Sequence, residues 1–412
     1  MQNKLAKIET TQLPEEVLFI LSELDSAGYK SYLVGGAVRD LLLCLDVSDY
    51  DITTSANPRE VKAVFPDYTV IDTGIEHGTV TILVDNQAFE VTSFRTDGLY
   101  LDHRRPESVQ LSRSLEEDTQ RRDFTINQIA YSPTEGLVDY HGGLKDLKAG
   151  IIRTVGEPEK RFGEDALRIL RCFRFSSTYG FTIEAETFTA ASNNISDLDY
   201  ISGERIRIEL EKLLLGQHLE EMWSTYLGLW SYLFPNVSHE YFENFNTEAF
   251  ELLGKSFIPR LLLVSTGKDA SKLATRLKLS RIEKDYLLNY SQLMGIEINR
   301  IGTDAVDLIR FAFESNTEVT DFLNISTAFA LAQKQDIAKY VEASVNIGLA
   351  LAEEVPLRPS ELLISGKDLI DAGFEQGPLI GAMLKELWIR VLEAELNNDR
   401  EALIASAEAD FR

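Results

Sequence analysis

The sequence is poor in cysteine and has no long apolar run. Its 412 residues include only Cys44 and Cys172, and neither belongs to a CxxC pair. This scarcity excludes a disulfide scaffold and argues against a zinc site built on cysteines. No run of about 18 apolar residues occurs, so we expect no membrane-spanning helix. The first residues also lack the apolar segment of a secretory signal, so we expect a cytoplasmic protein.

Positive charge is scarce as well. The chain has 41 Lys and Arg residues against 66 Asp and Glu residues, which gives a net charge of −25. A uniformly basic nucleic-acid coat protein is therefore excluded, and 44% hydrophobic residues exclude disorder throughout. Residues 101–180 nevertheless hold as many basic as acidic residues. An anion can bind at this neutral window while the remaining surface repels it, although acidic faces also serve solubility.

The chain changes character near residue 150. Before it, strand-like runs dominate, and residues 79–84 and 88–94 around Asp85-Asn86-Gln87 predict a β-hairpin. After about residue 160 the apolar spacing is helical, most clearly over 206–215 and 382–396. Breaks occur at Gly216, around Phe234-Pro235-Asn236, at Val355-Pro356 and at Gly377-Pro378. The pattern predicts an α/β domain followed by two or three helical domains.

Two carboxylates stand two residues apart in DYDITTSA. Asp49 and Asp51 would point to the same side of a strand, where their repulsion favours a bound cation. Mg²⁺ prefers such oxygen ligands together with substrate phosphates. A solvated turn is the alternative interpretation of this short motif alone. Glu90 lies in another predicted strand and either faces solvent or completes a metal site.

A glycine pair precedes these carboxylates in YLVGGAVRDLLL, residues 32–43. A strand there runs into Gly35 and Gly36, and a helix follows. Glycines allow a phosphate to approach the backbone, and Arg39 in the first helical turn can reach a triphosphate oxygen. A plain turn is again the alternative, but the combination with the two carboxylates is far more specific.

Four motifs in order carry a family resemblance: GGAVRD, DYD, RRDFTIN at 121–127 and EDALRILRCFRF at 164–175. Together they resemble the bacterial class II tRNA nucleotidyltransferases, the CCA-adding enzymes of the DNA polymerase β superfamily. The resemblance is strongest over 32–180 and continues weakly through 201–216 and 365–373. Cys44 stands where the family often has glycine, and Gln128 where it usually has alanine.

The resemblance implies an α+β protein with a polymerase-β-like nucleotidyltransferase head followed by an all-helical neck, body and tail. It places the catalytic head at 1–150, the base-recognising neck at 151–216, a tRNA-binding body at 217–330 and a tail that holds the tRNA elbow at 331–412. The family builds the 3′-terminal CCA of tRNA from CTP and ATP without a template. It requires no membrane and no obligate protein partner.

The resemblance also implies site roles. Asp49 and Asp51 would bind Mg²⁺ as catalytic residues. The nucleotide would be bound by Gly36, Arg39, Arg122, Asp123, Asp165, Arg168, Arg171 and Arg174. In this assignment Arg122 takes the phosphates, Asp123 takes the ribose hydroxyl, and Asp165 with Arg168 reads the base edge. From the residues alone, a helix cap at Asp123 is the favoured interpretation. For Asp165 and Arg168, at i and i+3, a helical salt bridge is the usual interpretation.

Two further segments are expected to serve tRNA addition. The polar stretch 95–109 would be the flexible loop that the family needs for the switch from C to A addition. Lys268, Lys272 and Arg276, at i, i+4 and i+8, together with Lys367, would contact tRNA phosphates, unless they form only a solvated face.

Three alternatives stay open at this point. A bacterial poly(A) polymerase shares the active-site motifs but tends to carry a basic C-terminal extension, whereas this chain ends in EALIASAEADFR. A partial enzyme that adds only CC or only A is the second. A non-catalytic tRNA-binding protein is the third, and the retained Asp49 and Asp51 argue against it. Some relatives of this family also carry a metal phosphohydrolase domain with a His…His-Asp…Asp pattern. No histidine of this sequence is followed by Asp, so we expect no such activity.

Overall fold

The structure is a computed structural model that describes residues 5–98 and 109–411. The chain divides into two compact units between Leu233 and Phe234, at the break predicted around Phe234-Pro235-Asn236. The finer division into head, neck, body and tail stays a prediction. Across the described residues, every helix is too short or too polar to cross a membrane.

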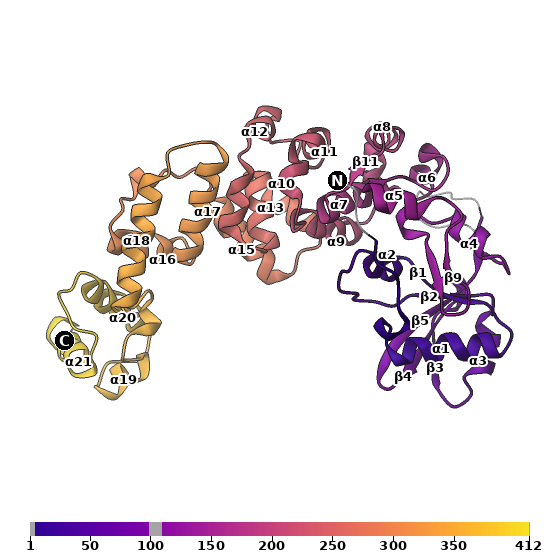
Figure 1. Cartoon of the computed structure of the whole chain (residues 1–412). Helices are drawn as coiled ribbons and strands as arrows, with labels where there is room; N and C mark the ends of the chain where they lie inside the picture. Colours follow the sequence, from indigo (N-terminus) through magenta and orange to yellow (C-terminus); the bar gives the residue numbers. More distant parts are fainter. Residues whose placement is uncertain (1–4, 99–108, 412) are drawn as a thin grey trace. The chain divides into compact units, whose positions relative to one another are not determined.

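The first unit is a mixed structure, coloured indigo to magenta in Figure 1. Its strands are β1 (Ser31–Val34), β2 (Ile52–Thr54), β3 (Thr69–Gly74), β4 (Thr79–Val84), β5 (Gln87–Ser93), β6 (Arg95–Asp97), β7 (Val109–Leu111), β8 (Ala130–Ser132), β9 (Gly136–Val138), β10 (Ile151–Ile152) and β11 (Thr182–Ile183). Its helices are α1 (Glu15–Ser26), α2 (Gly36–Leu42), α3 (Pro58–Val64), α4 (Leu115–Gln120), α5 (Gly143–Ala149), α6 (Pro158–Glu164), α7 (Leu167–Tyr179), α8 (Ala185–Asn193), α9 (Gly203–Leu214), α10 (Leu219–Met222) and α11 (Leu227–Leu233). Short 3₁₀ segments include η3 (Thr125–Asn127).

A seven-stranded sheet organises this unit, in the order β3-β4-β5-β2-β1-β8-β9. Only β2 and β5 pair in parallel, with Ile52 opposite Val91. The central strand β1 is buried along its whole length, because α1 and α2 pack against it. Its side chains Tyr32 and Val34 share a core with Phe94. The sheet thus fixes the end of β1 and the start of β2, where the glycine pair and the two carboxylates lie.

The hairpin predicted over 79–94 is present as β4 and β5. Its two turn residues, Asp85 and Asn86, both have positive φ, at 47° and 64°. Such a two-residue turn matches the twist of the strands that it joins, and Asp and Asn tolerate this conformation better than most residues. The sequence signal and the structure therefore agree here.

Helices dominate after residue 155. The predicted helix at 206–215 is α9, which packs along α7. The region expected to form an all-helical neck differs in one detail, because β10 and β11 form a small parallel pair in it. These strands have only two residues each, too few for a periodicity to be read from the sequence.

The second unit is helical across its described residues, as expected. It contains α12 (His239–Asn244), α13 (Phe257–Ser265), α14 (Ala270–Arg276), α15 (Arg281–Ser291), α16 (Ala305–Glu314), α17 (Val319–Ala332), α18 (Ala338–Ala352), α19 (Gly366–Asp371), α20 (Pro378–Leu392) and α21 (Arg400–Phe411). Its core includes the fully buried Phe250, Phe322 and Trp388. The α+β prediction for the whole chain is confirmed.

Candidate active site

A cavity of about 520 Å³ lies in the first unit between the sheet, α2, α7 and α9. All ten residues predicted to bind metal or nucleotide line it. These are Gly36, Arg39, Asp49, Asp51, Arg122, Asp123, Asp165, Arg168, Arg171 and Arg174. They come from four separate segments of the chain, so the fold brings together what the sequence shows only as dispersed motifs.

The two carboxylates of DYD lie just before a strand rather than within it. Strand β2 begins at Ile52, so the expected strand alternation does not orient Asp49 and Asp51. Instead, the Asp51 carbonyl accepts a hydrogen bond from Val34 N at 3.0 Å, which holds the segment beside the end of β1. Both side chains still line the cavity. The pKa of Asp51 is raised above its usual value. Burial is the largest cause and the negative charge of Asp49 adds to it, while Arg122 opposes both.

Asp49 and Asp51 differ from the other carboxylates of the cavity. Each of the others has an arginine partner: Asp40 pairs with Arg39, Asp123 with Arg171 and Asp165 with Arg205. Within residues 5–98 and 109–411, neither Asp49 nor Asp51 forms an ion pair, and Asp49 accepts only from Ser48 Oγ at 2.9 Å. Two unpaired oxygen donors side by side suit a divalent cation.

The first glycine of the pair is required by its backbone conformation rather than by lack of space. Gly35 has a positive φ of 69°, a conformation that disfavours other residues. A Cβ at this position would lie 3.5 Å from Arg122 Nη1 and 3.9 Å from Asp51 Oδ2. Gly36 then starts α2, with Arg39 Nη2 3.4 Å from the place of its missing Cβ.

Arg39 is built into the protein rather than free to reach a ligand. Its side chain is buried at 5% exposure and pairs through two 2.9 Å contacts with Asp40. It also donates to Asn127 Oδ1 and lies over the Tyr179 ring, 4.6 Å from its centre. The geometry makes Arg39 a link between α2, η3 and α7 at the cavity wall.

The RRDFTIN motif supplies two arginines that share one buried acid. Asp118 accepts from Arg121 at 2.8 Å and from Arg122 at 3.2 Å. Burial alone would raise the pKa of Asp118, but the two arginines outweigh it and lower that pKa. Arg122 keeps spare capacity, because among the described residues only its Nη2 donates a hydrogen bond, to Asp118, and its side chain is 18% exposed. It is therefore suited to receive an anion.

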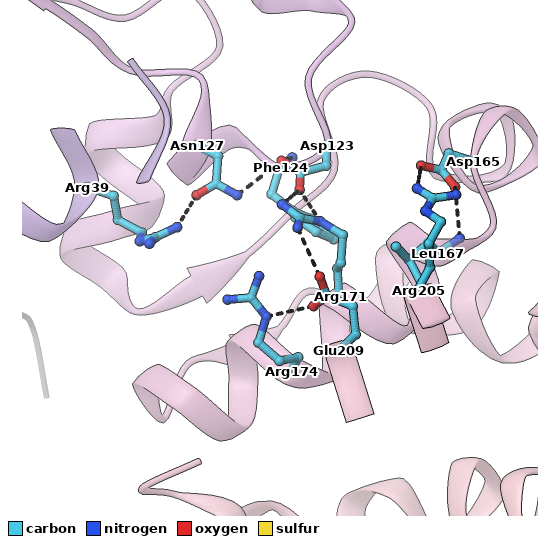
Figure 2. Close-up of polar contacts among 10 residues, drawn as sticks. All are labelled: Arg39, Asp123, Phe124, Asn127, Asp165, Leu167, Arg171, Arg174, Arg205 and Glu209. Atoms are coloured by element: carbon cyan, nitrogen blue, oxygen red, sulfur yellow. Dashed lines mark hydrogen bonds and ion pairs between the residues drawn. The ribbon is translucent and has the colours of Figure 1, made fainter. Parts of the chain in front are cut away.

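Asp123 stands at the centre of a continuous polar chain (Figure 2). Its carboxylate accepts from Phe124 N at 2.8 Å, from Asn127 Nδ2 at 3.0 Å, and from Arg171 Nε and Nη2 at 2.9 and 2.6 Å. Burial opposes ionisation, yet Arg171 and these hydrogen bonds hold the pKa of Asp123 well below its usual value. About four acceptor positions exist on a carboxylate, and all are used here.

The same chain continues onto α9. Glu209, at 5% exposure, accepts from Arg171 Nη1 at 3.3 Å and from Arg174 Nε at 2.9 Å. Burial lowers the pKa of Arg174, and Glu209 opposes this effect. Arg174 also lies over the Phe175 ring, 3.7 Å from its centre. Arg171 and Arg174, two of the three arginines predicted from the 164–175 motif, are therefore fixed by an acid that the sequence analysis did not select.

Asp165 and Arg168 do not share a helix, which corrects the spacing argument. Helix α6 ends at Glu164, Asp165 has an extended backbone with φ −143°, and α7 starts at Leu167. They also do not pair with each other. Arg205 holds Asp165 through contacts of 3.2 and 2.8 Å, as Figure 2 shows. Glu164 holds Arg168 at 2.8 Å.

Comparison with known proteins places this site in a family. The family model described as the poly A polymerase head domain matches residues 31–153. A second, "Probable RNA and SrmB- binding site of polymerase A", matches 180–240, and the model of tRNA nucleotidyltransferase domain 2 matches 260–407. The CCA-adding enzyme of Limosilactobacillus fermentum is 37% identical over 408 residues, which cover 97% of this chain and 98% of that one.

The chain belongs to the family of CCA-adding enzymes.

Other relatives agree. The CCA-adding enzyme of Limosilactobacillus reuteri is 38% identical over 400 residues, covering 94% of this chain and 95% of its own. A crystal structure of the Bacillus stearothermophilus CCA-adding enzyme in complex with CTP shows 32% identity and a TM-score of 0.77, with 97% of each chain covered. The resemblance inferred from the four motifs is confirmed. As a member of this family the chain is a nucleotidyltransferase, and its superfamily generally uses a divalent metal.

Other predicted residues lie apart from the cavity. Glu90 is exposed on β5 and is not among the residues that line the cavity. In the described part of the chain, no three His, Cys, Asp or Glu side chains group as a metal site, so two carboxylates are the candidate ligands. Most of the predicted C-to-A loop, residues 99–108, lies outside the described residues.

The basic stripe expected in the second unit is shorter than predicted. Helix α14 starts at Ala270, so only Lys272 and Arg276 belong to it, both exposed. Lys268 lies before the helix and donates to the Asn236 carbonyl at 2.9 Å, because Asp269 has a positive φ of 52°. Lys367 is exposed on α19. Their contact with tRNA stays a prediction.

Sequence reasoning missed several residues that line the cavity, and also Glu209, which contacts two of the lining arginines. Asn127 lies within the quoted RRDFTIN motif and connects Arg39 to Asp123. Arg205, Glu209 and Lys212 recur at i, i+4 and i+7, which puts them on one face of α9. This spacing of charged residues, together with the arginine-rich motif at 164–175, could have indicated these residues from the sequence.

Proposed function

We propose that this chain adds the 3′-terminal CCA to tRNA, using CTP and ATP, releasing pyrophosphate and depending on Mg²⁺. The relatives that carry the name CCA-adding enzyme support this reaction. The single observation that carries it in this structure is the spare hydrogen-bonding capacity at Asp165 and Arg168. That capacity complements cytosine and adenine and does not complement uracil or guanine.

Asp165 has one acceptor position left. Its Oδ1 accepts from Arg205 Nη1 at 3.2 Å and from Leu167 N at 3.2 Å, and its Oδ2 accepts from Arg205 Nη2 at 2.8 Å. With about four positions per carboxylate, one remains on Oδ2. It fits the exocyclic amine that cytosine and adenine carry. Uracil and guanine present a carbonyl oxygen there, so two acceptors would face each other.

Arg168 has the complementary donors. Its Nη1 donates to the Arg161 carbonyl at 2.9 Å and to Glu164 at 2.8 Å, and its Nη2 donates to the Arg121 carbonyl at 3.0 Å. Three of five N–H groups are used, which leaves two for ring acceptors of the base. Since Arg168 is 8% exposed and locked by these contacts, its direction is fixed before a nucleotide arrives. A paired contact of this kind gives about 1–3 kcal/mol of discrimination.

The two unpaired carboxylates are the proposed metal ligands. Asp49 and Asp51 would hold Mg²⁺, which when bound neutralises phosphate charge and activates the attacking hydroxyl. Arg122, with its spare hydrogen-bonding capacity, would bind the phosphates of the nucleotide. Asp123 is proposed to accept a hydrogen bond from a ribose hydroxyl. Because all its acceptor positions are used, this hydroxyl would share an oxygen that already accepts from Arg171 or Asn127. Arg39, Arg171 and Arg174 would support the phosphate wall through their fixed positions.

Length-resolved extension of tRNA tests the proposal. Transcripts ending before CCA, after CC and after CCA are incubated with Mg²⁺ and CTP, ATP or both. We expect three additions to the first, one to the second and none to the third. A long run of A would make the chain a poly(A) polymerase, and extension of only one transcript would make it a partial enzyme.

Two variants separate catalysis from binding. Asp49→Asn should abolish extension while tRNA binding persists, and Asp46→Asn, an exposed acid of the same segment, is the matched control. Asp165→Ala should weaken the choice of CTP and ATP over UTP and GTP more than it weakens tRNA binding. Unchanged selection would remove the base-reading assignment.

A further inference from the structure

The cavity contains one basic residue whose charge is not balanced by the protein. Each arginine that lines it forms an ion pair with a carboxylate: Arg39, Arg121, Arg122, Arg168, Arg171, Arg174 and Arg205. Lys212 also lines the cavity and is exposed. Across residues 5–98 and 109–411 its ammonium has no hydrogen bond and no ion pair. A lone ammonium on a flexible stem is a common way to bind a phosphate.

Lys212 is also placed at a defined end of the site. It is the last of the three charged residues on one face of α9, after Arg205 and Glu209. Arg205 holds the proposed base reader Asp165, and Glu209 holds Arg171 and Arg174. Seven residues separate Arg205 from Lys212, which is about 10 Å along a helix. An extended nucleoside triphosphate is longer than this, and the flexible four-carbon stem of Lys212 extends the reach of the site beyond the helix axis.

We propose that Lys212 binds the β- or γ-phosphate of the incoming CTP or ATP. The inference rests on the proposed function, because it takes the base to lie beside Asp165. With the base fixed there, the triphosphate runs along α9 past Arg171 and Arg174 and ends at Lys212. The same contact then holds the pyrophosphate product until it leaves.

Nucleotide is favoured over tRNA as the source of this phosphate. Lys212 shares its helix face with Arg205 and Glu209. It lines the same cavity as Arg205, Arg171 and Arg174. The residues proposed for tRNA contact, Lys272, Arg276 and Lys367, belong to the second unit. We therefore expect Lys212 to bind the nucleotide, the ligand proposed for this cavity, rather than tRNA.

Binding of pyrophosphate and CTP without tRNA gives the direct test. Lys212→Met keeps the aliphatic stem and removes the charge, and Lys212→Arg restores it. Lys148→Met, at an exposed lysine outside the cavity, is the matched control. By calorimetry we expect Lys212→Met to weaken both ligands about ten-fold, as for loss of one hydrogen bond to a charged group. Lys212→Arg and Lys148→Met should bind like the unmodified protein.

Kinetics distinguishes the possible failures. We expect the KM for CTP and for ATP to rise in Lys212→Met, with unchanged tRNA affinity. Weaker tRNA binding with unchanged pyrophosphate binding would overturn the proposal and assign Lys212 to the tRNA backbone. Equal pyrophosphate binding by all variants would also overturn it. If the unmodified protein adds no CCA, the proposed function fails, whereas the calorimetric comparison still decides whether Lys212 binds phosphate.

Discussion

Glu209 joins two arginines of α7 to α9, and its removal should have a measurable cost. We predict that Glu209→Gln lowers the free energy of unfolding of the first unit. Glutamine keeps one acceptor oxygen but presents an amide NH₂ to the other arginine. The 3.3 Å contact with Arg171 is weak, and Arg171 keeps its partner Asp123. The loss is therefore mainly that of the 2.9 Å contact with Arg174.

The magnitude follows from the burial of that pair. A hydrogen bond to a charged group contributes about 1.5–3 kcal/mol, and breaking a fully buried ion pair costs about 3–5 kcal/mol. Arg174 is 9% exposed but lines the cavity, so its pair with Glu209 is not fully buried and we expect about 2–3 kcal/mol. For a unit of this size, 1 kcal/mol corresponds to about 2–4 °C in Tm. The expected decrease in Tm is thus about 4–12 °C.

A double-mutant cycle measures the pair itself. Glu209→Gln, Arg174→Met and the double variant are unfolded in urea and followed by the fluorescence of Trp223 and Trp230, both buried in the first unit. The double variant should lose less unfolding free energy than the two single variants lose together, by about 1.5–3 kcal/mol. Arg171→Met in place of Arg174→Met should give a much smaller coupling. Coupling within about 0.5 kcal/mol of zero for Arg174 would refute the geometry.

Three further predictions concern the same unit. Arg205→Ala should raise the KM for CTP and ATP and reduce base selection at unchanged tRNA affinity, because Asp165 loses its two-point support; competition assays with UTP measure this. Cys44→Gly should stabilise the unit by about 0.5–1 kcal/mol in urea unfolding, since Cys44 has a positive φ of 57° that glycine adopts without strain. The lowered pKa of Asp123 means that its stabilisation is complete above about pH 4 and is lost as the pH falls further. Asp123→Asn should therefore lower stability at pH 7, and a pH series of unfolding midpoints should show the difference shrinking below pH 4.

The sequence selected residues that the fold brings together, although their roles stay predictions. Asp49 and Asp51 were selected as oxygen ligands for a metal, Arg122 and Asp123 followed from the family resemblance, and all four line one cavity. The hairpin at 79–94 was also predictable, because its turn residues and strand periods are local signals. Helix α9 was found from its apolar spacing alone.

Other features depended on tertiary contacts that no local pattern shows. The break between α6 and α7 at Asp165 follows Gly163 by two residues, but one glycine within a helical pattern does not show where the helix ends. It is held by Arg205, forty residues further along the chain. The start of β2 at Ile52 was likewise misplaced, because pairing with β1 and β5 decides where that strand begins. Cys44 was noted only as a departure from the family's glycine, and its positive φ explains the glycine.

The internal pairing of the cavity arginines has a consequence for the catalytic cycle. A phosphate that approaches Arg171 or Arg174 meets a guanidinium whose charge a carboxylate already balances, although some of its N–H groups have no partner among the described residues. The phosphate therefore gains less than it would from an unpaired cation, and affinity at these residues is limited. When the leaving group departs, the carboxylates still balance the arginines and no unpaired buried cation is left. In the proposed cycle of three successive additions, each releasing pyrophosphate, these residues therefore do not bind the product so tightly that its release is slowed.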